Sequence, residues 1–242
     1  MNLPLTILLP AFCASMIVLA THVPLGQEVL KRGIIFLDLA IAQIAGLGAI
    51  IASSHGYSPL GTEAFALCFA ISGSLVLAIL GKRYPAIFEA LIGSSFVLAA
   101  SAGVLFLAAN PHGAEHFQEL LAGQILWVSP KTLLWAMILT AFVLLLWFWK
   151  KPSGYGFYLL FAPAVMMSVQ LIGVYLVFAT LIFPALAAKN RSYPLLWGYG
   201  TGIIGFVTGI ALSFVLDLPA GPLCCWLLAV TATGVSLWQR VC

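Results

Sequence analysis

The feature that most constrains the fold is an uncharged stretch, from Gly156 to Ala188, that is interrupted by Pro163, Gly173 and Pro184. A straight helix of that length would reach roughly 50 Å, well beyond the ~30 Å hydrocarbon core of a bilayer. In lipid, the backbone groups that a break frees are tolerated only where protein or a water-filled path covers them. We therefore expect two short spans that meet near Gly173 and face the interior of a helical bundle.

The composition is that of an integral membrane protein, with 63% hydrophobic and 7% charged residues and a mean hydropathy of +1.13. Apolar runs long enough to cross a membrane recur, and strand-like alternation is absent, so the spans are predicted to be helices. We expect an all-α, polytopic membrane helical bundle of eight or nine spans, forming one transmembrane domain over residues 1–242. The expected spans lie near 5–22, 34–53, 61–80, 85–108, 132–149, 157–172, 174–188, 194–216 and 222–238.

Basic residues fall in alternate loops between these spans, if the central stretch crosses twice. The basic pairs are Lys31 with Arg32, Lys82 with Arg83, Lys150 with Lys151, and Lys189 with Arg191. The positive-inside rule then places these loops and the C-terminus in the cytoplasm, and the N-terminus outside. The five cysteines lie mostly in apolar runs and are expected to be inert thiols rather than a disulfide framework.

Asp38 is the strongest functional candidate, because an ionised carboxylate inside a span is costly unless it faces a partner or water. A role in helix packing remains the alternative. Gln43 follows five residues later, roughly 140° around a straight helix, so the two side chains are not expected to chelate one ion together. Glu89 and Gln170 are further candidates for a substrate path, although interface pairing is an alternative for Glu89.

His112 and His116 lie four residues apart in an outer segment, a spacing that puts two imidazoles on one helical face. This arrangement suits a transient site for a divalent metal or a polar docking surface, but a plain solvated loop helix explains it as well. The chain has no phosphate-binding loop of the Walker type, so any nucleotide chemistry must come from another subunit.

Several stretches resemble one family, the membrane permeases of metal-type ABC importers, whose relatives carry zinc, manganese or iron(II). The similarity rests on VPLGQEVLKRGIIFLDLAIAQIAGLG (23–48), FEALIGSSFVLAASAGVLFL (88–107), ELLAGQILWVS (119–129), SVQLIGVYLVFATLIFPALAA (168–188) and SFVLDLPAGP (213–222). These stretches cover most of the chain in the family's order. The most specific are the blocks around Gly173 to Ala185 and Ser213 to Gly221.

The resemblance implies a type II importer-like permease without enzymatic activity of its own, in a bacterial inner membrane. It implies a second permease copy or paralogue, a cytoplasmic ATPase that binds ATP, an extracytoplasmic solute-binding protein, and no cofactor on this chain. Zinc or manganese would cross by alternating access at the dimer interface. Gly173 and Pro184 would let the broken helices rearrange, and Pro184, Lys189 and Arg191 would contact the ATPase.

The chain departs from the family's pattern at its membrane-embedded pair. That pair is usually Asp-x-x-x-His, whereas this chain has Asp38 and Gln43, and alignment on Gly48 displaces the aspartate by one position. The link Lys150–Gly156 also lacks the longer polar stretch of many relatives. A self-sufficient transporter driven by an ion gradient, with Asp38 or Glu89 as the coupling carboxylate, is the alternative function.

Overall fold

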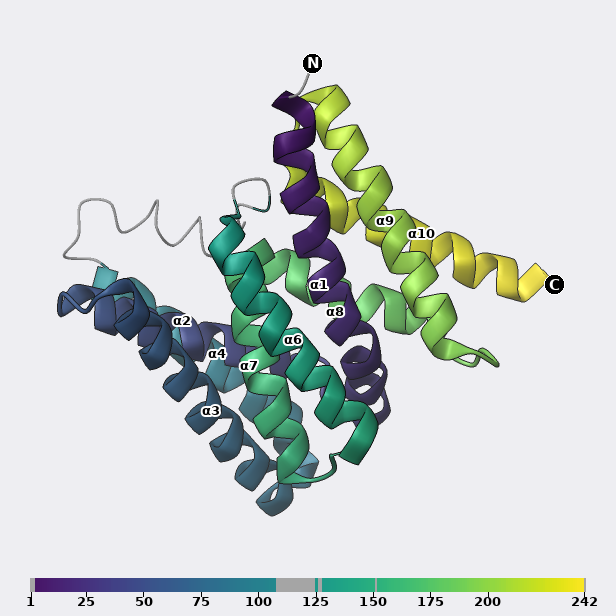
Figure 1. Cartoon of the computed structure of the whole chain (residues 1–242). Coiled ribbons are helices and arrows are strands. Elements are labelled where there is room, and N and C mark those ends of the chain that lie inside the picture. The colour runs from purple at the N-terminus through teal and green to yellow at the C-terminus, as the bar shows by residue number, and fades with distance from the viewer. Residues whose placement is uncertain (1–2, 108–124, 126–127, 151, 242) are drawn as a thin grey trace.

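The computed structural model of the chain describes residues 3–107, 125, 128–150 and 152–241, and within them every regular element is helical (Figure 1). The elements are α1 (Leu3–Arg32), α2 (Leu37–Ser54), α3 (Pro59–Arg83), a 3-10 helix η1 (Pro85–Ile87), α4 (Phe88–Leu107), α6 (Pro130–Lys150), α7 (Tyr155–Ile172), α8 (Val174–Ala188), α9 (Pro194–Leu216) and α10 (Ala220–Val241). Eight helices in the described residues are long and apolar enough to cross a membrane, and α8 is a shorter apolar helix. The predicted fold class is confirmed.

The first helix is longer than the span predicted near 5–22, because its polar end remains helical as far as Arg32. Pro24 inside this helix has no N–H group, so the carbonyl of Ala20 loses its usual partner. The hydroxyl of Tyr199 in α9 donates to that carbonyl at 2.9 Å. An ion pair of 2.8 Å between Glu28 and Arg32, one turn apart, stabilises the last turn.

Gly173 separates α7 from α8, as the sequence predicted. Its backbone has φ 80° and ψ 162°, a region that is essentially restricted to glycine. The Gly173 N–H still bonds the carbonyl of Val169 at 2.9 Å, and its own carbonyl accepts from the N–H of Val177 at 3.0 Å. The change of direction is therefore confined to one residue, and no hydrogen bond from Val174 N–H continues the helix across it.

The helices form two groups that share α1 and α8. In Figure 1, α2, α3 and α4 lie on one side of the molecule and α9 and α10 on the other, with α1 and α8 between them. One buried apolar cluster includes Leu181 and Ile182 of α8, and the other includes Leu176 and Val177 of the same helix. α1 crosses α8 at Gly26, where an added Cβ would meet the backbone of Leu181. The short helix α8 thus contributes to the apolar core of both groups of helices.

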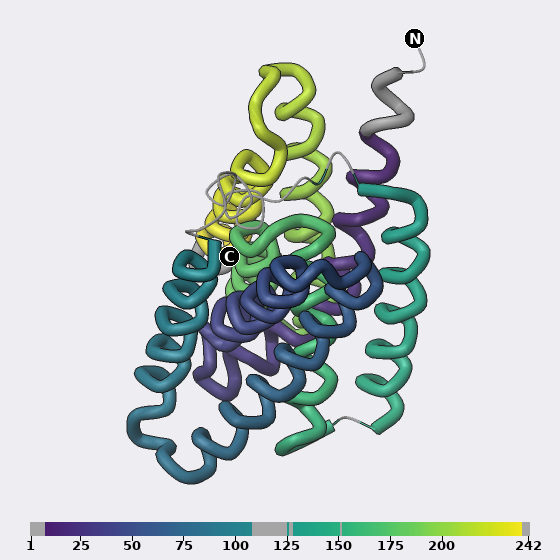
Figure 2. Tube along the Cα trace, turned by 90° about the vertical axis from the view of Figure 1, so that its left-hand side faces the viewer, coloured from purple at the N-terminus to yellow at the C-terminus, as the bar shows by residue number. Residues whose placement is uncertain are grey.

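The turns after α1, α3 and α6 lie toward one end of the bundle, the lower end in Figures 1 and 2. The ammonium of Lys82, at the end of α3, lies 3.6 Å from the ring centroid of Tyr155, at the start of α7. The carboxylate of Glu89 accepts a hydrogen bond of 3.2 Å from the N–H of Ile35, in the turn after α1. The fold therefore brings together the basic loops that the sequence places far apart.

Candidate functional site

A groove lies between α2, α4, α8 and α10, and we call it the α8 groove. Its volume is about 440 Å³. It is lined by Leu39, Gln43, Phe96, Ala100, Val174, Tyr175, Phe178, Ala179, Phe183 and Cys225. Leu39 and Gln43 lie one turn apart on α2, so their side chains share the face that the groove exposes. The lining is mostly apolar, with one amide, one phenol and one thiol as its side-chain polar groups.

Gln43 is the polar side chain that α2 contributes to the groove. The residue is only 7% exposed, and its amide makes no hydrogen bond to any other described residue. The amide atoms of Gln43 are not among the fully buried unpaired atoms of the described residues, so they are accessible from the groove. Gln43 therefore presents unused donors and an acceptor to whatever enters the groove.

The N-terminus of α8 opens into the same groove through Val174 and Tyr175. The first three N–H groups of a helix have no carbonyl within the helix to bond, and here the first such bond is from Val177 N–H to Gly173. No backbone hydrogen bond from the N–H groups of residues 174–176 to a described residue replaces them. This end of the groove therefore carries the partial positive charge of a helix N-terminus.

Asp38 does not line the α8 groove, although it lies on the same helix as Gln43. Its side chain is buried, with 1% exposure, and neither carboxylate oxygen has a hydrogen-bond partner in the part of the chain that the structure describes. Spacing explains the separation, because Leu39, and not Asp38, is one helical turn from Gln43. Asp38 instead lies at the start of α2, where the helix N-terminus favours a carboxylate.

The other two predicted path residues lie elsewhere. Glu89 is exposed at the start of α4, where it bonds the N–H of Ile35. Gln170 is exposed on the last turn of α7 and is not among the residues that line the groove. Their role in a substrate path stays a prediction that the geometry of the groove does not favour.

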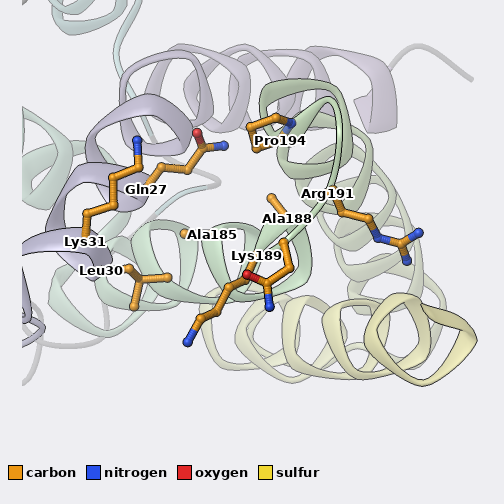
Figure 3. Close-up of a pocket in the computed structure, with 9 residues that line it drawn as sticks. Gln27, Leu30, Lys31, Ala185, Ala188, Lys189, Arg191 and Pro194 are labelled. Atoms are coloured by element: carbon orange, nitrogen blue, oxygen red, sulfur yellow. The ribbon is translucent and has the colours of Figure 1, made fainter. Parts of the chain in front are cut away.

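A second pocket, of about 280 Å³, lies at the end of α1 and α8, and we call it the basic pocket (Figure 3). Its lining is Gln27, Leu30, Lys31, Ala185, Ala188, Lys189, Asn190, Arg191 and Pro194. Gln27 and Lys31 approach it from α1, on the side opposite Ala188 and Lys189. The basic pocket lies where the end of α1, the end of α8 and the turn before α9 meet.

The three residues expected to contact an ATPase lie in different environments. Lys189 is exposed, whereas Pro184 is buried within α8. Arg191 points away from the basic pocket in Figure 3, and its guanidinium stacks 4.1 Å from the ring centroid of Trp197. It also donates to the carbonyl of Val235 in α10 at 2.9 Å. Of the three, Lys189 is the one whose side chain is exposed and available to contact a partner.

A metal site cannot be built from the described residues alone, since they contain no group of three or more His, Cys, Asp or Glu side chains that could hold one ion. His112 and His116 lie outside the described residues. Sequence reasoning missed Tyr175, Phe178 and Cys225 as groove residues. Leu39 carried a usable signal, because it is one turn from Gln43, but the α8 and α10 residues reach the groove only through the tertiary fold.

Comparison with known proteins finds a matching family, similar sequences and a similar fold. A family model described as the ABC 3 transport family matches residues 5–153 and 151–239. A probable metal transport system membrane protein of Chlamydia pneumoniae is 24% identical over 91% of this chain and 85% of its own. A protein of the same description from Chlamydia trachomatis is 24% identical over 82% of this chain and 77% of its own. Among solved structures, PsaBC from Streptococcus pneumoniae in complex with Fab matches with a TM-score of 0.76 and 19% identity, covering 93% of this chain and 89% of that one.

Proposed function

The chain belongs to the ABC 3 transport family, and on that premise we propose that it is the permease subunit of an ATP-driven importer of a divalent metal, zinc or manganese. The descriptions of the chlamydial relatives as probable metal transport system membrane proteins support the metal substrate. ATP binding and hydrolysis belong to a separate cytoplasmic ATPase, because this sequence has no Walker motif. A second permease copy or paralogue and an extracytoplasmic solute-binding protein complete the transporter.

The observation that carries this proposal is the position of α8, which belongs to both pockets. Its first ten residues supply Val174, Tyr175, Phe178, Ala179 and Phe183 to the α8 groove. Its last turn supplies Ala185 and Ala188 to the basic pocket. Pro184 lies between the two sets. A partner that moves the basic pocket would therefore move one wall of the groove through a single short helix.

We propose that the transporter works by alternating access, which this arrangement supports. The α8 groove would face a second permease copy, so that the two copies enclose the substrate path. Gly173 would act as the hinge between α7 and α8, since a single glycine holds the change of direction there. The ATPase would dock against the basic pocket and Lys189 from the cytoplasmic side, where the positive-inside rule puts the basic loops. Closure of the ATPase would tilt α8 and open the groove to the opposite side.

Metal uptake by the complete transporter tests this function. We expect cells that express the permease with its ATPase and binding protein to accumulate ⁶⁵Zn²⁺ or ⁵⁴Mn²⁺, and cells that lack the permease to lose this uptake. Lys189→Glu should lower both the ATPase pulled down with the permease and the uptake rate, each at least threefold. Asp217→Lys, an exposed charge change in the turn between α9 and α10, is the matched control. ATPase-independent uptake would contradict the proposal.

A second candidate mechanism is transport coupled to a proton or sodium gradient. The unpaired carboxylate of Asp38 would be the coupling residue. Glu89 is the weaker candidate for such a coupling residue, because it is exposed and already accepts a hydrogen bond. Reconstitution of the purified chain alone in liposomes separates the mechanisms. Metal uptake driven by an imposed gradient without ATPase would favour the secondary transporter.

A further inference from the structure

The α8 groove has too few suitable ligands for a bare divalent cation. Zinc in proteins takes imidazole, thiolate or carboxylate ligands, usually three or four of them, and manganese favours carboxylate and water. The groove offers the amide of Gln43, the phenol of Tyr175 and the thiol of Cys225, with apolar residues between them. A second copy would double this set to two thiols and add no imidazole or carboxylate, which is still fewer than the three or four ligands that zinc takes. At about 440 Å³ the groove has the size of a small-molecule site.

The electrostatics of the groove also oppose a bare cation. The free N–H groups of residues 174–176 form the positive end of α8, and Val174 and Tyr175 line the groove there. Such an end attracts anions and oxygen acceptors and repels cations. The carboxylate that could offset this effect, Asp38, lies outside the lining.

Gln43 provides an independent indication of the same ligand chemistry. It is more than nine-tenths buried, it lines the groove, and its amide has no hydrogen-bond partner among the described residues. An amide N–H₂ group donates two hydrogen bonds and carries no charge, so it pairs well with a carboxylate oxygen. The unpaired N–H groups of the α8 N-terminus and of Gln43 therefore suit one oxygen-bearing ligand.

From these contacts we propose that the metal enters the α8 groove as a complex with a small carboxylate chelator, and not as a bare ion. The inference rests on the proposed import function and specifies its substrate class. Carboxylate oxygens that are not bound to the metal accept hydrogen bonds from the α8 N-terminus and from Gln43. The chelator supplies the metal ligands that the groove lacks, and the aromatic walls, which include Phe96 and Phe178, enclose the complex.

Equilibrium dialysis of the permease–ATPase complex in nanodiscs tests this inference, with ⁶⁵Zn²⁺ alone and ⁶⁵Zn²⁺ with excess citrate as probes. We expect citrate to raise the bound ⁶⁵Zn at least tenfold. Gln43→Leu should remove that increase. Gln43→Glu, which is isosteric, should remove it as well and raise the binding of ⁶⁵Zn²⁺ alone. Ser94→Ala, an exposed position of α4 outside the groove, should behave as the wild-type complex does.

Two results would overturn the inference: saturable binding of ⁶⁵Zn²⁺ alone that Gln43→Leu abolishes, or bound ⁶⁵Zn that citrate leaves unchanged or lowers. Size-exclusion chromatography checks that each variant still forms the permease–ATPase complex. If the Gln43→Leu complex dissociates, the test uses the isosteric Gln43→Glu variant instead. Failure here leaves ATP-dependent metal uptake by cells intact. Loss of the proposed function would instead appear as uptake that does not depend on the permease.

Discussion

At the scale of single residues, two polar side chains of α2 meet opposite environments. Gln43 opens onto a groove, whereas Asp38 is enclosed without a partner for either oxygen. Burying a polar group without a hydrogen bond costs about 1–3 kcal/mol, and a charge costs more. The unpaired carboxylate of Asp38 therefore lowers the stability of the fold. Such locally destabilising residues are common at functional sites.

Asp38→Leu should therefore stabilise the fold while it impairs transport. Removing the unpaired carboxyl group should raise the free energy of unfolding by about 1–3 kcal/mol. We expect a higher thermal midpoint in nanodiscs together with metal uptake at least tenfold lower. Ser74→Ala is the control, because Ser74 is also buried but bonds the carbonyl of Ile71, so it should not stabilise. A lower midpoint for Asp38→Leu would show that the carboxylate has a stabilising partner.

The hydroxyl of Tyr199 gives a second prediction at this scale. It satisfies the carbonyl of Ala20 that Pro24 leaves free in α1. Tyr199→Phe should lower the free energy of unfolding by about 1 kcal/mol, the typical worth of one interhelical hydrogen bond in a membrane protein. Thermal denaturation in nanodiscs measures the change. Tyr193→Phe, at an exposed position, should leave stability unchanged, and an equal loss in both variants would count against this role.

At the scale of elements, how well the sequence predicted a feature depended on whether local chemistry determines it. The span from 194 to 216 was placed correctly because Pro194 begins the helix and Asp217 follows its end. The end of α1 was misplaced, since a polar segment remained helical through an ion pair and a contact with α9. The groove residues of α8 and α10 were missed because only the crossing of distant helices brings them together.

Gly173→Ala tests the break between α7 and α8. The backbone angles at this position are strained for any residue with a Cβ, at a cost of about 1–3 kcal/mol. We expect a thermal midpoint lower by several degrees and slower uptake, since both neighbouring helices depend on the same residue. Gly93→Ala in α4 is the matched control, because an added Cβ there meets nothing within 4 Å. It should leave the midpoint unchanged or raise it slightly.

At the scale of the whole molecule, contacts across the lower end join loops that are far apart in the sequence. The cation–π contact of Lys82 with Tyr155 and the hydrogen bond from Ile35 to Glu89 connect three successive turns at that end. The alternation of basic and non-basic loops in the sequence predicted, from charge alone, that these turns lie at the same end of the bundle. The sequence could not show which helices meet there, since charge bias reports the side of the membrane and not the neighbour.

Single cysteines in a background without native cysteines test the orientation of the bundle. We expect Asp217→Cys to react with a membrane-impermeant maleimide on intact cells, because the turn between α9 and α10 is predicted to face outward. Lys82→Cys and Lys189→Cys should react only after permeabilisation, since the basic loops are expected inside. All three positions are exposed, so accessibility within the fold does not bias the comparison. The reverse labelling pattern would invert the topology.

The two pockets that share α8 have no residue in common. Substitutions at groove residues such as Leu39 and Gln43 therefore leave unchanged the lining of the basic pocket, which is the proposed ATPase contact. If the proposed function holds, the groove could change its cargo while the proposed ATPase contact stays the same. In the proposed transporter the fifteen residues of α8, about 22 Å long, would connect the groove that receives the cargo to the pocket that meets the ATPase.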